Sequence, residues 1–148
     1  MNFQEAPLYL PEIISAYPEL EMEAIENSGE KKNHLGCKTI ERDGKFVIQY
    51  SNNTEMKPFL RFQIARALGE HFLKDLKGEK NDTADYVFDI QKNLFAAKIL
   101  CPAAIVKKEM KNINISKDIV TQLAETFWVS KSFMNRRLKD ILQNSSEI

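Results

Sequence analysis

The sequence predicts an α+β protein of mostly helical character, with a small antiparallel sheet and a single domain over residues 1–148. Several stretches repeat apolar residues every three or four positions, which is typical of helices. One pair of short alternating runs predicts a hairpin. A chain of 148 residues with 43% hydrophobic and 28% charged side chains is long enough for one core and short for two.

The first element, within an N-terminal helical segment over residues 1–30, is predicted to be a helix that opens at Pro11, because proline suits the first helical turn. Its apolar positions follow a loose helical period and are Ile14, Tyr17, Leu20 and Ile25. The polar, glycine-containing stretch SGEKKN (28–33) should end this helix in a loop.

The next element is a hairpin around Asp43-Gly44, with arms at 39–41 and 45–50. Aspartate and glycine tolerate the positive φ that a type I′ turn needs, so this dipeptide between alternating runs is a strong hairpin signal.

Two long helices should follow. The first covers about 58–76 and carries apolar residues every fourth position: Leu60, Ile64, Leu68, Phe72 and Leu76. A charged loop is expected over 76–87, and the second helix should run from Val87 to the stop at Cys101-Pro102.

The C-terminal part should contain three shorter helices. The segment AAIVKKEM (103–110) is the first of them. Ser116 is expected to cap a helix through Phe127, and Ser130 to cap another over about 131–142. The tail, 143–148, is expected to be frayed.

Composition excludes several classes of function. Basic and acidic residues balance at 21 each, so total charge gives no sign of a nucleic-acid or anionic-membrane partner. Cys37 and Cys101 form no paired metal or redox motif and are read as buried, reduced thiols. The N-terminus lacks a secretory signal, and no stretch is apolar enough to span a membrane. We expect a cytoplasmic protein.

The segment RFQIARALGEHFL (61–73) has the residue spacing of a zinc-peptidase helix but lacks its zinc ligands. In zinc peptidases, H-E-x-x-H places two imidazoles on one helical face, with the glutamate as general base. The corresponding five positions here are Arg66, Ala67, Leu68, Gly69 and Glu70.

Three segments in the right order resemble the ImmA/IrrE family of metallopeptidases. They are RFQIARALGEH (61–71), DIQKNLFAAKILCP (89–102) and LAETFWVSKSFMNRRL (123–138). The hairpin before the first segment also matches the family's layout. The resemblance covers residues 33–142 and implies a zincin-like fold.

The departures from the family pattern lie at the residues that should carry the chemistry. Both histidine ligands are replaced, by Arg66 and Glu70, and the general base by Ala67. A guanidinium has no lone pair for zinc, and alanine cannot take a proton from water. The third ligand position falls on Asp89 or Gln91, and the alignment does not choose between them.

The resemblance therefore implies a pseudopeptidase with no catalytic residue, metal ligand or cofactor. Active relatives cleave Xre-type repressors, or induce their cleavage, and are typically encoded beside them. We expect binding of a protein partner, such as an Xre-type transcriptional regulator of phage or bacterial origin, in the degenerate cleft. The sequence does not indicate the oligomeric state.

Three residues near these positions have alternative interpretations. His71 is rotated ~100° from Glu70, so a packed or solvent-edge role is favoured over a substitute ligand, and an adventitious metal at Glu70, His71 and Asp89 is the lesser alternative. Cys101 is favoured as a core residue over a catalytic thiol. Trp128 is read as packed and partly buried, or as a lid or partner anchor of the cleft.

Two further functions compete with partner binding. A zinc peptidase with a rebuilt site is one. The other is a DNA-binding regulator, since residues 123–139 have the residue pattern of a helix-turn-helix. Arg136, Arg137 and Lys139 would be available to bind phosphates. The neutral total charge argues against it, and the family uses this segment within the peptidase domain.

The last expectation concerns what replaced the metal. Arg66 and Glu70 are four residues apart and share one helical face. We expect Arg66 to bond to Glu70, to Asp89, or to both, so that a protein cation stands where the metal would be.

Overall fold

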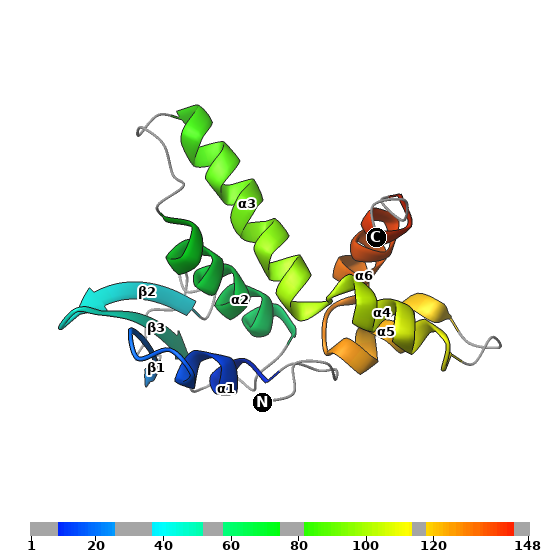
Figure 1. Ribbon diagram of the computed structural model, residues 1–148, viewed down its shortest axis with the longest axis horizontal. Coiled ribbons are helices and arrows are strands. Elements are labelled where there is room, and N and C mark those ends of the chain that lie inside the picture. Colours follow the sequence, from blue (N-terminus) through cyan, green and yellow to red (C-terminus); the bar gives the residue numbers. More distant parts are fainter. Residues whose placement is uncertain (1–8, 26–36, 52–57, 75–81, 114–117, 144–148) are drawn as a thin grey trace. The chain divides into compact units, whose positions relative to one another are not determined.

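The computed structural model describes residues 9–25, 37–51, 58–74, 82–113 and 118–143 (Figure 1). This part of the chain forms a mostly helical α+β fold, as the sequence predicts. Its elements are α1 (Leu10–Ser15), β1 (Leu20–Ile25), β2 (Cys37–Arg42), β3 (Lys45–Ser51), α2 (Pro58–Leu73), α3 (Asp82–Leu100), α4 (Ala103–Met110), α5 (Ile119–Phe127) and α6 (Lys131–Gln143). No described helix has the length and apolar character needed to cross a membrane.

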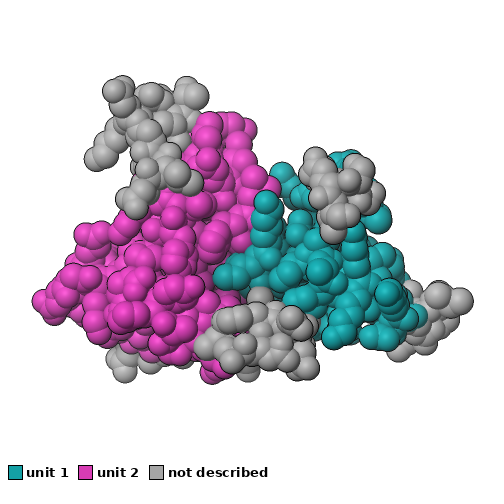
Figure 2. Space-filling view, viewed as in Figure 1, with its two compact units in different colours: residues 1–8, 97–148 teal, residues 9–96 magenta. Residues whose placement is uncertain are grey.

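The chain divides into two compact units (Figure 2). The N-terminal unit comprises the described residues from 9 to 96, and the C-terminal unit those from 97 to 143. The boundary falls within helix α3. The single domain expected over 1–148 stays a prediction.

The prediction that the first helix continues past its first turns to Ile25 is wrong. Pro11 lies in the first turn of α1 as expected, but α1 ends at Ser15, and Leu20–Ile25 is strand β1. Pro18 supplies the reason, because proline cannot donate a helical hydrogen bond and disfavours the helical region for Tyr17 before it. The loop expected over 28–33 lies outside the described residues.

The predicted hairpin is confirmed. Strands β2 and β3 pair antiparallel, with Arg42 opposite Lys45, and Asp43 and Gly44 between them have φ of 54° and 76°. These positive values are those of a type I′ turn. The sheet is larger than predicted, since β1 pairs parallel to β3 and gives the strand order β1-β3-β2.

Helix α2 covers this sheet, and the core of the N-terminal unit lies between them (Figure 1). Ile48 of β3 is fully buried, as are Ile64 and Leu68 of α2. Helix α2 ends at Leu73, and residue 76, where its end was predicted, lies outside the described residues.

Helix α3 begins earlier than predicted, and part of the expected loop over 76–87 is therefore helical. It starts at Asp82, and no proline or glycine interrupts the sequence from there to Leu100. It packs closely on α2, because a Cβ added to Gly69 would lie 3.1 Å from the Phe95 ring. Glycine at this position permits the close approach.

The C-terminal unit contains the three short helices that the sequence predicts. Asp118 caps α5 by accepting a hydrogen bond from the Val120 amide at 3.0 Å. The expected cap, Ser116, lies outside the described residues. Ser130 caps α6 as predicted, accepting from the Phe133 amide at 3.1 Å. The tail beyond Gln143 is also outside the described residues.

Candidate functional site

The candidate site is built on the face of α2 that carries Arg66 and Glu70. The apolar stripe of α2 faces the core and leaves the side chain of Arg66 28% exposed at the edge of that stripe. Residues four apart lie one above the other on a helix, so Arg66 and Glu70 share this face.

Arg66 reaches from α2 to α3. Its Nη2 donates to Asp89 Oδ1 at 2.9 Å, and its Nε donates to Asn93 Oδ1 at 2.7 Å. These distances are typical of hydrogen bonds from a charged donor. The expectation that Arg66 bonds an acidic residue is confirmed for Asp89, and Asn93 is an additional partner that the sequence analysis did not assign.

Asp89 is held by two cations. Lys92 Nζ lies 3.1 Å from Asp89 Oδ1, the same oxygen that Arg66 contacts. The hydrogen bond from Lys92 and the charges of Lys92 and Arg66 hold the pKa of Asp89 below its ordinary value. Because the Asp89 side chain is 56% exposed, water screens much of this attraction.

Of the two alternatives for the third ligand position, the structure brings Asp89 into contact with Arg66. Residues two apart on a helix are rotated by about 200°. Since Asp89 faces Arg66, Gln91 points away from the α2 face that carries Arg66. Asp89 is therefore the residue of α3 that lies at the candidate site.

Glu70 faces the sheet instead of pairing with Arg66. Thr39 Oγ1 of β2 donates to Glu70 Oε2 at 3.4 Å. Burial, and secondly the charge of Glu70, raise the pKa of the neighbouring Cys37 thiol to about 11. The thiol is thus protonated at neutral pH and is a poor nucleophile and metal ligand.

Ala67 and His71 do not join this group. Ala67 is buried. The His71 side chain is 12% exposed, packs against the rings of Phe46 and Phe72, and has its Nε2 3.6 Å from Glu19 Oε1. Its packed role is confirmed, and it lies on a different face of α2 from Arg66.

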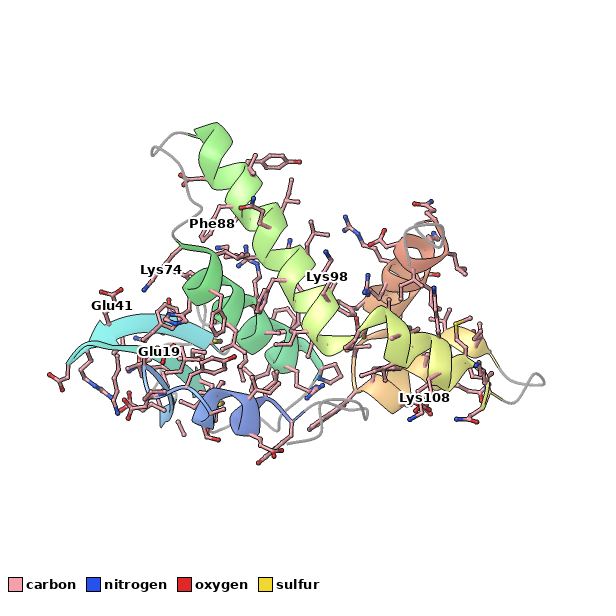
Figure 3. All side chains as sticks on the ribbon, in the orientation of Figure 1. Glu19, Glu41, Lys74, Phe88, Lys98 and Lys108 are labelled. Carbon is pink, nitrogen blue, oxygen red and sulfur yellow. The ribbon has the colours of Figure 1, made fainter. Side chains whose placement is uncertain are left out.

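A separate pocket of about 310 Å³ adjoins His71 at the turn of the hairpin. Glu19 and Lys74, labelled in Figure 3, both line it. The buried Nδ1 of His71 has no hydrogen-bond partner among the described residues. None of Arg66, Asp89 and Glu70 lines this pocket, so it is distinct from the candidate site.

Trp128 and Cys101 belong to the C-terminal unit. Trp128 ends α5 in the left-handed conformation, with φ 56° and ψ 52°, and remains 39% exposed. Cys101 is fully buried, as expected for a core residue, and its carbonyl accepts a hydrogen bond from Arg137 Nε at 2.9 Å. The interpretation of Trp128 as part of the cleft stays a prediction.

The residues that the resemblance places at the family's zinc positions do not fit a zinc ion. Arg66 offers only donors, Ala67 a methyl group, and Asp89 a carboxylate oxygen already bonded to two cations. Zinc needs three protein ligands with free lone pairs to hold it in a catalytic site. Glu70 alone has the required chemistry and is not engaged by a cation among the described residues.

Two site residues could have been found in the sequence. Asn93 is one helical turn beyond Asp89 and therefore shares its face, and Lys92 is three residues beyond it. The participation of Thr39 could not be read in this way, because it depends on how the sheet and α2 pack.

Comparison with known families gives one match over most of the chain. The model of the Peptidase_M78 family, described as the IrrE N-terminal-like domain, matches residues 24–139. No curated protein matches the chain.

Proposed function

The chain belongs to the ImmA/IrrE family of metallopeptidases, and we propose that it holds a protein partner at the former catalytic site without cutting it. The observation that carries this proposal is the bond of Arg66 to Asp89 across α2 and α3. In this proposal a protein cation occupies the position between the two helices at which active relatives bind a metal cation. The family's fold is then kept, and hydrolysis is lost.

The proposed docking surface combines a strand edge with the polar face of α2. Among the described residues β2 pairs only with β3, which makes it an edge strand of the sheet. An extended segment of a partner can add to such an edge through its backbone, while neighbouring side chains provide specificity. Glu70 lies against β2 through Thr39, and Arg66 lies one turn away on the same helix.

A protein of the Xre type is the partner that the family membership suggests. In this proposal the chain acts in the cytoplasm as a regulator of such a repressor. The sequence supports the loss of cleavage, because its only histidines are His34 and His71 and no H-x-x-x-H pair exists.

The test uses the purified protein and a purified Xre-type regulator. Calorimetry should show a complex, and electrophoresis should show an intact regulator with or without added zinc. Arg66→Leu should weaken binding at least about tenfold, a loss of roughly 1.4 kcal/mol. Arg136→Leu makes the same charge change on α6, which is no part of this docking surface, and should bind as the native protein does.

Two results would overturn the proposal. Cleavage of the regulator that stops when a chelator is added would show a rebuilt peptidase. Equal binding by the native and Arg66→Leu proteins would move the docking surface away from the candidate site.

A further inference from the structure

The neutral total charge conceals a separation of charge along the chain. Residues 97–148 contain nine lysines and arginines and five acidic residues, whereas residues 9–96 contain 12 and 15. The C-terminal part is therefore basic and the N-terminal part acidic. The neutral total charge therefore does not exclude a polyanionic partner for the basic part, because an asymmetry of charge between two parts of a chain favours one.

Helices α5 and α6 have the connectivity of a helix-turn-helix. Residues 128–130 join them, and a three-residue turn is typical of this motif. Buried residues on both helices, including Leu123, Phe127, Met134 and Leu138, hold the pair together. Trp128 adopts the left-handed conformation that such a turn often gives to glycine.

The outward face of α6 carries side chains suited to DNA. Opposite the buried Met134, Leu138 and Ile141 lie five exposed polar residues: Ser132, Asn135, Arg136, Lys139 and Gln143. Arginine and lysine bind phosphates and guanine, asparagine and glutamine bind adenine, and serine binds either kind of base. The acidic residue of α6 is Asp140, which is half-buried one turn beyond Arg136 and interacts electrostatically with Arg137.

The cations of this face are also unneutralised in the part of the chain that the structure describes. No carboxylate among the described residues forms an ion pair with Arg136 or Lys139. Arg137 differs, because its Nε donates to the Cys101 carbonyl and burial lowers its pKa. Arg137 therefore fixes α6 within its unit, and its contact with phosphates stays a prediction.

We propose that the C-terminal unit binds duplex DNA through α6, with Arg136 and Lys139 on phosphates or base edges and Asn135 on base edges. In a helix-turn-helix the second helix enters the major groove, and α6 is the second helix here. This site is separate from the one proposed for the protein partner, so either can fail without the other.

Fluorescence anisotropy of the full-length protein with a labelled, mixed-sequence duplex about two helical turns long tests the proposal. Binding should weaken steeply as salt increases, because each phosphate contact releases condensed cations. Arg136→Ala with Lys139→Ala should weaken binding at low salt at least about tenfold and reduce the slope of log K against log salt by about 2.

Lys107→Ala with Lys108→Ala is the matched control. It removes the same charge from α4, where Figure 3 shows Lys108 at the surface of the same unit, and should keep most of the affinity. Circular dichroism should show both variants folded, since Arg136, Lys139 and Lys108 are exposed. No binding by the native protein at low salt, or an equal loss in both variants, would overturn the proposal.

Discussion

The α2–α3 crossing and the outward face of α6 use the same residue types in opposite ways. At the crossing, Arg66 is bonded to Asp89 and Asn93 and lies at the edge of a packed core. On α6, Arg136 is exposed and bonded to no described carboxylate. Whether an arginine stabilises the fold or is available to a partner therefore depends on whether a neighbouring carboxylate neutralises it.

This difference assigns different partners to the two regions. A neutralised cation between two helices presents a shaped, nearly uncharged surface, which suits another protein. An unneutralised row of cations and amides presents a field and hydrogen-bond donors, which suits a polyanion.

The largest effect expected at the crossing is the return of a metal site. In the native protein a chelator should leave the melting temperature unchanged. Arg66→His with Glu70→His would add two imidazoles one turn apart, with Asp89 freed as the third ligand. Zinc at 100 times its Kd should then stabilise the fold by about 2.7 kcal/mol.

The control for this variant is the additional change Asp89→Ala, which should abolish the stabilisation by zinc. If Gln91→Ala abolishes it instead, the assignment of the third position to Asp89 is wrong.

The next effect concerns the turn between α5 and α6. Trp128 has a positive φ, which costs most residues roughly 1–2 kcal/mol and glycine almost nothing. Trp128→Gly should therefore be more stable than Trp128→Ala by about 1 kcal/mol in urea unfolding, since both variants lose the indole. At Lys139, inside α6, the order should reverse, with alanine better by about 1 kcal/mol.

The third effect compares the two arginines directly. Arg66→Ala removes two hydrogen bonds, one of them within an ion pair, and should cost about 1 kcal/mol once screening at the exposed Asp89 is included. Arg136→Ala should leave the free energy of unfolding unchanged. Equal losses in urea unfolding would contradict the assignment of one arginine to structure and the other to binding.

The sequence was sufficient wherever the cause of a structure is local. Asp43-Gly44 determines the hairpin turn, and Ser130 determines the start of α6, because each acts on its own backbone neighbours. The position of Arg66 against α3 was also predictable, from a resemblance that supplied the pairing of the two helices.

The sequence was insufficient where the cause lies elsewhere in the chain. Residues 20–25 form a strand because β3 pairs with them in parallel. A helical period was read from Leu20 and Ile25, whereas Leu20, Met22 and Ala24 alternate with glutamates. The contact of Glu70 with Thr39 likewise depends on the packing of α2 on the sheet. The separation of charge between residues 9–96 and 97–148 can be read from the sequence, but the net charge of the whole chain, which is zero, conceals it.

The smallest effect expected is the dependence of stability on pH at Asp89. Its pKa is lower in the folded protein than in the unfolded chain, owing to Lys92 and then Arg66. The stabilisation is therefore complete above the pKa of the unfolded carboxyl, and it is lost as the pH falls through the lower pKa of the folded state. The difference in unfolding free energy between the native protein and Asp89→Asn should be positive at neutral pH and shrink through this acidic range. In an Arg66→Ala, Lys92→Ala background the same difference should no longer vary with pH, because no cation remains to favour the charged form. A pH dependence that persists there would mean that Arg66 and Lys92 do not neutralise Asp89, and the contrast with α6 would fail.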